Sequence, residues 1–579
     1  MLHIEQAIRA KWPSLQKKPA YPLIIKLLKK LLHEQEINDF IQANQHLRGF
    51  AFLDQVLNHF EFSYQVNSEQ LKRLPADGRV LIVANHPLGS LDGLALLKLV
   101  RSVRSDVRIV ANDLLTNIDP LQELFLPLDN LSRNPKKTVF KAILQALEQE
   151  QAVIIFPAGE VSRIRPTGVK DGLWKTGFLK LAAKSQAPVL PILIDARNSA
   201  LFYALSTLYK PLGTLLLVQE MFNKKTQQIE FHIGKPIAAK TLTSAPQSGK
   251  ILANQFRKHL YHLGKPKKLK RQPFLPTLET LAHPMDRKAL RNAILQGELL
   301  GETHDHKKIY LFSYDANSPV MHEIGRLREL TFRSVEEGTG KALDLDYYDA
   351  FYEHLVLWDE EEWELVGAYR LGQAYLTQQA RNKQSHEIYS ASLFEFLPKM
   401  ESYLPHCLEL GRSFVQPKYW GMRSLDYLWF GIGAYLKKHP HLRYMFGPVS
   451  LSNAYPQTAK ELILGFYLQQ FGDYRSLVKA KQPFELTPAS QAIAEETFKG
   501  EYNESLKKLN ALLALEGVKL PTLFKQYAEL CDDRGCHFID FNVDPLFADC
   551  VDAFIFVEIE KIKAKKRQRY LGEIRISAA

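Results

Sequence analysis

Short apolar runs separated by helical stretches constrain the fold of this chain more than any other feature. Within residues 79–238, the runs of strand length are Val80–Ala84, Val107–Ala111, Ala152–Phe156 and Val189–Ile194. These runs are apolar at consecutive positions and not at alternate ones, so both faces of each strand must be buried. The pattern predicts an α/β fold with a mostly parallel sheet, to which Ile229–Ile233 adds an edge strand.

The same patterns predict two α/β domains. We expect a mostly helical segment over residues 1–75, a first domain over 76–265, a basic linker with prolines over 266–284 and a second domain over 285–579. The helices expected are Leu91–Val103, Thr138–Gln149, Leu173–Lys184, Glu323–Phe332 and Leu425–Lys437. In the second domain the strands expected are Ile309–Phe312, Trp363–Arg370, Cys407–Val415 and Tyr444–Val449.

Composition excludes several classes of protein. Hydrophobic residues make up 46% and charged residues 24% of the chain, which excludes wholesale disorder. Four cysteines in 579 residues exclude a disulfide scaffold and indicate a reducing compartment. Residues 1–12 lack the apolar core of a signal peptide, and no stretch of about 18 apolar residues is free of charges. We therefore expect a cytoplasmic protein without a membrane-spanning helix.

Basic residues are in excess, with 75 Lys and Arg against 63 Asp and Glu, a net charge of +12. Nucleic acid, an anionic membrane or an acidic protein would each be attracted to such a chain. Nucleic acid is disfavoured, because the basic segments are short and accompany no nucleic-acid-binding signature. In Ala20–Leu32, apolar residues at helical spacing stand opposite Lys26, Lys29 and Lys30. This stretch fits a helix at a membrane interface or a helix packed on the domain behind it.

The first chemical motif follows strand Val80–Ala84 directly and reads N-H-P-L-G-S-L-D from Asn85 to Asp92. Ligands of a parallel sheet bind at the carboxyl ends of its strands. A carboxylate shortly after a histidine fixes the imidazole tautomer and stabilises the imidazolium that forms when the ring accepts a proton. His86 and Asp92 are thus a candidate base and its partner, with a histidine that only caps a tight turn as the alternative.

Two further segments extend this motif. The strand Ala152–Phe156 runs into F-P-A-G-E-V-S-R, and A-P-V-L-P begins another strand at Ala187. In this order the three segments resemble the glycerolipid (lysophosphatidate-type) acyltransferase family over about residues 60–265. The resemblance implies that His86 is the general base for an acceptor hydroxyl, which attacks an acyl thioester directly, and that Asp92 pairs with His86. It also implies substrate-binding roles for Asn85, Gly159, Glu160 and Arg163.

The motifs depart from the usual family pattern at two places. Five residues, where the family usually has four, separate His86 from Asp92. Glu160 and Arg163 stand two positions downstream of the Glu and Arg in the usual F-P-E-G-T-R, in which the arginine helps to hold the acceptor's phosphate. These variants resemble the branch of the family that acylates lyso-aminolipids such as lyso-ornithine lipid. The segments Leu128–Arg133 and Arg197–Ser199 are consistent with that branch, or are turns.

A second set of chemical residues extends from Arg328 to Arg412. Its order resembles the N-acyltransferases of the GNAT fold that use acyl carrier protein, among them the ornithine-lipid N-acyltransferases and, more distantly, the acyl-homoserine-lactone synthases. The resemblance covers about residues 310–560 and implies a mixed sheet. The matching positions are Arg328, Phe332, Asp346, Asp349, Arg370, Glu409 and Arg412. We expect Glu409 to accept the proton of an amine nucleophile, an aspartate to hold the amino group, and Arg370 or Arg412 to bind a carboxylate.

The acyl donor is expected to be a carrier-protein thioester. An ordinary GNAT enzyme cradles the pyrophosphate of coenzyme A on an R/Q-x-x-G-x-G/A loop at a helix N-terminus. The equivalent Lys418–Arg423 here reads K-Y-W-G-M-R, so one glycine remains and Arg423 replaces a small residue. This favours acyl carrier protein over acyl-CoA. No tightly bound cofactor and no metal site are expected, because Cys531 and Cys536 lack a second pair of ligands at suitable spacing.

Taken together, the two resemblances imply a bifunctional aminolipid synthase. The second domain would attach a 3-hydroxyacyl group to the α-amine of an amino acid, most simply ornithine, and the first would acylate the hydroxyl of the resulting lyso-lipid. The expected partners are acyl carrier protein and the anionic inner face of the cell membrane. Two alternatives stay open: a lysophospholipid acyltransferase with an accessory second domain, and a non-enzymatic, haemolysin-like membrane-binding protein.

Overall fold

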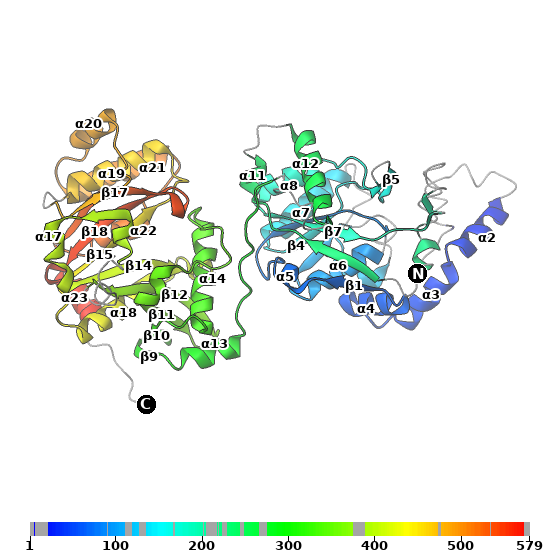
Figure 1. Ribbon diagram of the computed structural model, residues 1–579, viewed down its shortest axis with the longest axis horizontal. Coiled ribbons are helices and arrows are strands. Elements are labelled where there is room, and N and C mark those ends of the chain that lie inside the picture. Colours follow the sequence, from blue (N-terminus) through cyan, green and yellow to red (C-terminus); the bar gives the residue numbers. More distant parts are fainter. Residues whose placement is uncertain are drawn as a thin grey trace. The chain divides into compact units, whose positions relative to one another are not determined.

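The computed structural model forms two compact units, Met1–His283 and Pro284–Ala579, each with its own central sheet (Figure 1). It describes residues 5, 21–89, 91–110, 118–126, 135–165, 168–200, 202–203, 217, 219–222, 228–243, 248–265, 275–374, 388–472, 476–532 and 534–572. Leu128–Arg133, most of residues 1–20 and the linker residues 266–274 lie outside this part. None of the described helices combines the length and the apolar character that crossing a bilayer requires.

The sheet of the first unit has six strands in the order β1-β8-β7-β2-β4-β3. Their bounds are β1 Ser63–Val66, β2 Val80–Ala84, β3 Val107–Ile109, β4 Ala152–Ile155, β7 Val189–Asp195 and β8 Gln228–Ile233. Strands β7, β2, β4 and β3 are mutually parallel, which confirms the mostly parallel sheet. The prediction of β8 as the edge strand is wrong, because β1, from the segment expected to be helical, pairs with its outer side.

Both faces of this sheet are covered by helices, as its apolar strands require. Val80, Ile82 and Ala84 of β2 pack with α4 (Gly49–His59) and α6 (Leu91–Arg101). Leu81 and Val83 face the opposite core, with α7 (Pro135–Glu148), α8 (Gly177–Ser185) and α12 (Gly249–His262). The remaining elements are α2 Tyr21–Leu31, α3 Glu34–Ala43, α5 Ser68–Leu71, η3 Asp119–Leu124, α11 Ala239–Thr243 and the hairpin of β5 Arg163–Arg165 with β6 Gly168–Lys170.

Helix α8 begins later than the sequence pattern predicts. The expected helix was Leu173–Lys184, but residues 171–175 are irregular and α8 starts at Gly177. The indole of Trp174 donates a hydrogen bond to the buried carboxylate of Asp171, and Leu173 is exposed. The residues that seemed to extend the helix therefore form a turn, which is held by a side-chain contact.

The second unit contains the predicted mixed sheet. Its eight strands have the order β17-β18-β15-β14-β12-β11-β10-β9. Their bounds are β9 Glu298–Glu302, β10 Lys307–Ser313, β11 Glu353–Asp359, β12 Glu364–Gln373, β14 Cys407–Val415, β15 Tyr444–Leu451, β17 Cys536–Asp544 and β18 Cys550–Glu558. Among the described strands of this sheet, β14 and β15 form the one parallel pair, and they pair at three positions, Cys407–Glu409 with Tyr444–Phe446. Beyond these positions the two strands are no longer paired with each other.

Helices also cover both faces of the second sheet. One face packs against α13 (Arg287–Ile294) and α14 (Pro319–Ser334), and the other against α18 (Ser424–Lys438) and α19 (Gln457–Phe471). Helix α14 starts four residues before the expected Glu323, because Ser318 caps it and Pro319 occupies its first position. The other elements are η5 Tyr347–Phe351, β13 Phe394–Phe396, β16 Val478–Ala480, α16 Ser390–Leu393, α17 Pro398–Glu401, η6 Leu404–His406, η7 Pro417–Tyr419, α20 Pro488–Thr497, α21 Tyr502–Leu515, α22 Thr522–Ala528, η8 Pro545–Phe547, η9 Ile559–Lys561 and α23 Ala564–Leu571.

Candidate active sites

His86 and Asp92 form a close pair at the carboxyl end of β2. Nδ1 of His86 lies 3.0 Å from Oδ2 of Asp92, a fully buried residue in the first turn of α6. The backbone amides of Leu88 and Gly89 donate to the same oxygen over 2.9 and 3.4 Å. The imidazole also stacks on the ring of Phe156, with centroids 4.1 Å apart. Asp92 thus orients the ring through Nδ1, and among the described residues no group hydrogen-bonds to Nε2.

The charges around this pair determine its proton affinity. Burial alone would lower the pKa of His86, but the charge and hydrogen bond of Asp92, with a smaller contribution from Asp171, raise it above its ordinary value. Burial raises the pKa of Asp92, whereas His86 and the two amides lower it below its ordinary value. Asp92 therefore stays ionised, and His86 gains a proton readily, as a general base must.

A second buried carboxylate, Asp171, braces the loop that carries His86. It accepts hydrogen bonds from Ser162 Oγ at 2.5 Å, from Trp174 Nε1 at 2.9 Å and from the backbone amide of His86 at 3.4 Å. The backbone amide of Ser162 in turn donates to the carbonyl of His86 over 2.8 Å. Asp171 and Ser162 were not among the predicted site residues. Ser162 stands inside the segment F-P-A-G-E-V-S-R, but the resemblance implies no role for it, and the contact of Asp171 with His86 spans 85 residues of chain and follows no motif.

The other predicted residues of the first unit lie in different surroundings. The amide of Asn85 exchanges hydrogen bonds of 2.9 and 2.8 Å with the backbone of Ile194, which ties β2 to β7. Gly159 has a φ of +65°, which the turn after β4 requires. Glu160 and Arg163 form an ion pair of 3.9 Å. Their proximity to each other is a finding, while their contacts with substrate stay a prediction.

One of the two segments assigned to the lyso-aminolipid branch can be placed. Asn198 Nδ2 donates to the carbonyl of Pro87 over 3.0 Å, and the backbone amide of Asn198 donates to the hydroxyl of Tyr203 over 3.0 Å. Asn198 therefore supports the turn that directly follows His86. The other segment, Leu128–Arg133, lies outside the described residues.

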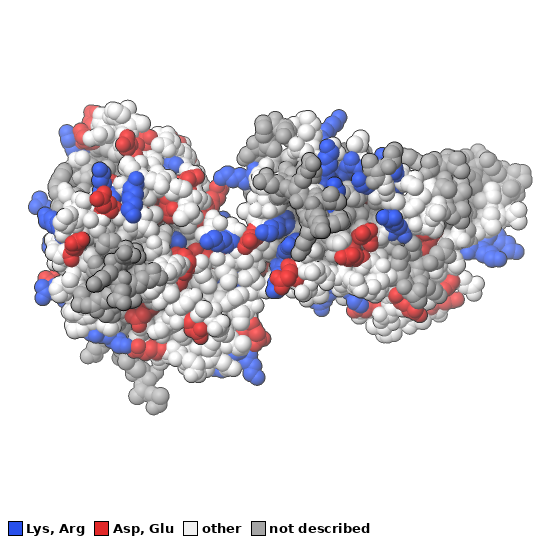
Figure 2. Space-filling model, viewed as in Figure 1, with Lys and Arg blue, Asp and Glu red and all other residues white. Residues whose placement is uncertain are grey.

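Cationic side chains line a cavity of about 440 Å³ in the first unit. The basic residues in its lining are Arg165, Lys170, Arg257, Lys258, His262 and Lys265. Tyr261 and Lys265 also line a smaller cavity of about 160 Å³, which reaches Asn85 and Pro87 on either side of His86. Figure 2 shows Lys and Arg side chains gathered over the α12 and β5 side of this unit. Such a concentration of positive charge favours an anionic ligand.

In the second unit the predicted arginines and aspartates form one ionic network. Arg328 and Asp349 are buried and paired, with Nη2 of Arg328 2.7 Å from Oδ1 of Asp349. Arg370 Nη1 lies 2.7 Å from Asp346 Oδ1, and Arg412 Nη2 lies 3.2 Å from Asp346 Oδ2. Asp346 caps η5, with Asp349 completing a capping box. The structure brings all five residues together, and among the described residues Nε and Nη2 of Arg370 and Nε of Arg412 have no hydrogen-bond partner.

Arg412 takes up a strained backbone conformation within this network. Its φ is +48°, a value that residues with a side chain rarely adopt. The register of β12 and β14 shifts here, so that Arg412 and Ser413 oppose one residue, Tyr369. This β-bulge turns the guanidinium of Arg412 over the rings of Tyr389 and Phe547, at 4.8 Å from each centroid.

Glu409 lies deeper than the sequence suggested. Its carboxylate accepts hydrogen bonds from the hydroxyl of Tyr352, and from the amide and hydroxyl of Ser390 over 2.7 and 2.6 Å. Burial raises its pKa above the ordinary value, although these hydrogen bonds oppose the shift. Glu409 is 2% exposed and does not line the cavity described next. Its role as proton acceptor stays a prediction, while its observed contacts anchor Ser390 and Tyr352.

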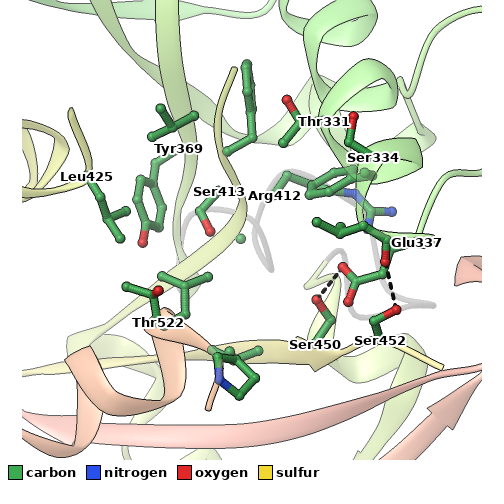
Figure 3. A pocket seen from close by; sticks show the side chains of 18 of the residues that line it. Thr331, Ser334, Glu337, Tyr369, Arg412, Ser413, Leu425, Ser450, Ser452 and Thr522 are labelled. Carbon is green, nitrogen blue, oxygen red and sulfur yellow. Dashed lines mark hydrogen bonds between the residues drawn. The ribbon is translucent and has the colours of Figure 1, made fainter. Parts of the chain in front are cut away.

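A cavity of about 870 Å³ opens where β14 and β15 separate. Its lining includes residues 410–415 of β14, 448–450 of β15, residues 419–422 before α18, the first two residues of α18, the end of α14 and residues 521–523. Figure 3 shows Arg412, Glu337, Ser450 and Tyr369 around it. Gly447 directly follows the last paired residue of β15, Phe446. A side chain does not fit there, because a Cβ would lie 2.1 Å from the carbonyl oxygen of Leu410.

Comparison with known proteins assigns the chain. A family model described as Acyltransferase matches residues 6–267, and one described as Acetyltransferase (GNAT) domain matches residues 327–430. A glycine N(alpha)-acyltransferase of Phocaeicola vulgatus is 30% identical over 309 residues, covering 51% of this chain and 93% of that protein. A lyso-glycine lipid O-acyltransferase of Bacteroides thetaiotaomicron is 30% identical over 249 residues, covering 42% of this chain and 90% of that protein. The chain belongs to both of these acyltransferase families.

The two family models confirm the predicted resemblances to an O-acyltransferase and to a GNAT enzyme. An L-ornithine N(alpha)-acyltransferase of Brucella abortus is also 29% identical over 266 residues, covering 43% of this chain and 80% of that protein. The protein is therefore an enzyme that transfers acyl groups.

The four cysteines of this acyltransferase are free and buried. Burial raises the pKa of Cys531 to about 12 and that of Cys536 well above its ordinary value, so both thiols stay protonated near neutral pH. Among the described residues, no group of three or more His, Cys, Asp and Glu is arranged to hold a metal ion.

We expect Asp92→Asn to lower the pKa of His86, because the negative charge and the hydrogen bond that stabilise the imidazolium are lost. NMR titration of the histidine ring resonances measures this pKa, with His86→Ala identifying the signal among 18 histidines. Asp171→Asn serves as the control and should lower the pKa less, because its charge contributes less. An unchanged pKa in Asp92→Asn would contradict the geometry of the pair.

Proposed function

We propose that the chain is a bifunctional aminolipid synthase. The second unit transfers a 3-hydroxyacyl group from a thioester to the α-amine of an amino acid, and the first unit then acylates the hydroxyl of that lyso-lipid. The observation that carries the proposal is the His86–Asp92 pair at a strand end, in one chain with the Arg412-lined cavity of a GNAT unit. The relatives support it, because one is named for N-acylation and another for O-acylation of a lyso-lipid.

The acceptor amino acid is ornithine or glycine. The family resemblance implied ornithine, whereas two relatives that each match 51% of this chain are named for glycine. Both carry the α-amine and the carboxylate that the N-acyl transfer uses, and they differ in the side-chain ammonium of ornithine. Competition between the two labelled amino acids for one acyl donor distinguishes them.

The geometry of the first unit suits direct transfer to a hydroxyl. With Nδ1 of His86 held by Asp92, Nε2 accepts the proton of the lyso-lipid's hydroxyl as its oxygen attacks the thioester carbon. The new C–O bond forms, the C–S bond breaks, and the imidazolium returns its proton to the leaving thiolate. Asp92 stabilises the imidazolium between these two steps.

The basic cavity is the proposed contact for the acyl donor of the first unit. Acyl carrier proteins are acidic and carry their acyl group on a phosphate-bearing arm, so the charges of Arg165, Lys170 and Lys258 complement them. The cavity shares Tyr261 and Lys265 with the smaller one beside His86. Acyl-CoA carries phosphates as well and remains the second donor to be compared.

Helix α2 is the proposed contact with the membrane. Leu23 and Leu27 are 73% and 65% exposed, while Ile25 is buried. Lys26 and Lys30 are also exposed and stand at spacings of three and four residues from these leucines, so they share their face. The sequence pattern had placed the lysines opposite the apolar residues. An exposed face of leucine and lysine fits an anionic bilayer surface, which supports peripheral association.

His86→Ala should make a heterologous host that lacks aminolipids accumulate the lyso-lipid, because loss of a general base slows O-acylation by about 10²- to 10⁴-fold. Mass spectrometry of total lipids measures both products. The matched control is His232→Ala in β8, since both histidine side chains are 16% exposed and His232 lines neither cavity.

If the wild-type enzyme forms neither lipid when a hydroxyacyl donor is present, the proposed function is wrong. If labelled lysophosphatidate is acylated and no aminolipid appears, the lysophospholipid alternative holds.

Lys258→Glu should raise the KM for acyl carrier protein in the O-acyl transfer roughly fivefold at low salt, and the difference should shrink as salt screens the charges. Steady-state kinetics with acyl carrier protein and with acyl-CoA measure this effect for each donor. Lys180→Glu on α8 is the control, because it makes the same charge change at an exposed lysine outside the cavity. Equal KM values for the two variants would contradict this contact.

Leu23→Asp together with Leu27→Asp should abolish sedimentation of the protein with anionic vesicles, because the exposed apolar face of α2 is removed. Wild type should bind vesicles with phosphatidylglycerol more than neutral phosphatidylcholine vesicles. Ile251→Asp on α12 is the control, since this exposed apolar residue lies on another helix. Undiminished binding of the double variant would assign membrane contact to another surface.

A further inference from the structure

Two carboxylates that no sequence motif indicated line the cavity of the second unit. Glu337 follows the end of α14, and Asp552 lies on β18. The two side chains are 6% and 4% exposed, so neither is a solvated surface acid. Thr331 on α14 lines the same cavity, and among the described residues its buried hydroxyl has no hydrogen-bond partner. The cavity therefore presents two buried carboxylates and, among the described residues, a hydroxyl without a hydrogen-bond partner.

Strand β15 holds Glu337 in place. Ser450 Oγ donates to Glu337 Oε2 over 2.9 Å, and Ser452 Oγ donates to the carbonyl of Val335 over 2.7 Å (Figure 3). Ser450 is also the register partner of Asp552 across β15 and β18. The two carboxylates are thus brought together by neighbouring strands on one side of the cavity.

The groups around Glu337 keep its proton exchangeable near neutral pH. Burial raises the pKa of Glu337 to about 7, against the opposing hydrogen bond of Ser450 and charge of Arg412. Burial and the nearby charges of Asp544 and Glu337 raise the pKa of Asp552 well above its ordinary value. The titratable and charged groups that interact with Glu337 are Arg412 from β14, Cys550 and Asp552 from β18, and Tyr455 after β15.

We propose that Glu337 is the catalytic residue that accepts the proton of the amino acid's α-ammonium in the N-acyl transfer of the second unit. This inference rests on the proposed function and names the base of that reaction. Glu337 lines the cavity, and among the described residues its carboxylate accepts one hydrogen bond, from Ser450. Glu409, by contrast, accepts three hydrogen bonds from Tyr352 and Ser390 and lies outside the lining.

The step balances without a further reactant. The carboxylate of Glu337 removes one proton from the ammonium, and the amine nitrogen attacks the thioester carbon. The C–N bond forms, the C–S bond breaks, and the thiolate leaves with a proton that the nitrogen loses as it becomes an amide. Arg412 lies beside the same cavity, where its positive charge can face the carboxylate of the amino acid.

Glu337→Gln tests the inference, because it keeps the shape of the side chain and removes the proton acceptor. We expect kcat/KM for N-acylation by wild type to rise with pH through about 7, as Glu337 loses its proton. The variant should lose this rise and at least about 100-fold of the rate. Glu504→Gln, at an exposed glutamate of α21 outside the cavity, is the control and should keep both. Glu337→Asp should keep the pH dependence at a reduced rate.

Ser450→Ala provides a second, independent readout. Its hydroxyl lowers the pKa of Glu337, so removing it should move the rise in kcat/KM to higher pH while the limiting rate changes little. This variant decides the question if circular dichroism shows that Glu337→Gln does not fold.

Unchanged rate and pH profile in Glu337→Gln, with wild type active, would overturn the inference and leave the proposed function standing. A loss in Glu409→Gln, with folding intact and Glu337→Gln active, would assign the base to Glu409. Absence of N-acyl product from wild type with glycine and with ornithine would overturn the proposed function instead. Running both amino acids also separates a base from a residue that only holds the ornithine side chain, since the latter would matter for ornithine alone.

Discussion

Both sites of this protein lie where the backbone of a strand leaves its β-ladder. In the first unit, β2 ends at Ala84 and the next residues place His86 beside Asp92. In the second, β14 and β15 pair at three positions and then separate, which opens a cavity of about 870 Å³. Because paired strands satisfy their own amides and carbonyls, such points are where a sheet accommodates a substrate.

Buried, paired charges fix the geometry beside the cavity of the second unit. In the second unit, Arg328, Arg370 and Arg412 meet Asp346 and Asp349, and truncating one member of such a pair costs about 3–5 kcal/mol because the other is left buried and unpaired. Such a network is weak evidence for stability, but it fixes geometry. It keeps Arg412 in its left-handed conformation at the β-bulge, next to the cavity.

Much of the fold was predictable, because consecutive apolar residues leave few alternatives to a covered sheet. Val80–Ala84 and Cys407–Val415 are strands with the expected bounds. The start of α8 was not predictable, because the hydrogen bond between Trp174 and Asp171 overrides the helical pattern of the sequence. The prediction that β8 lies at the edge of the sheet was wrong for a similar reason, because its outer neighbour β1 comes from a distant segment of the chain.

The pairing of His86 with Asp92 was visible in the sequence, because both lie within one short loop and its helix. The gathering of the arginines and aspartates of the second unit followed from a family resemblance. Asp171, Glu337 and Asp552 carried no such signal. Their surroundings depend on burial and on residues far away in the chain, and burial is what raises the pKa of Glu337. The sequence alone thus determined the central strands β2, β4, β7 and β14, the local His-Asp pair and, through family resemblance, the reaction class. Only the tertiary structure decided which carboxylates face the cavity and which, like Glu409, are enclosed by hydrogen bonds, because both outcomes depend on contacts between strands that are remote in sequence.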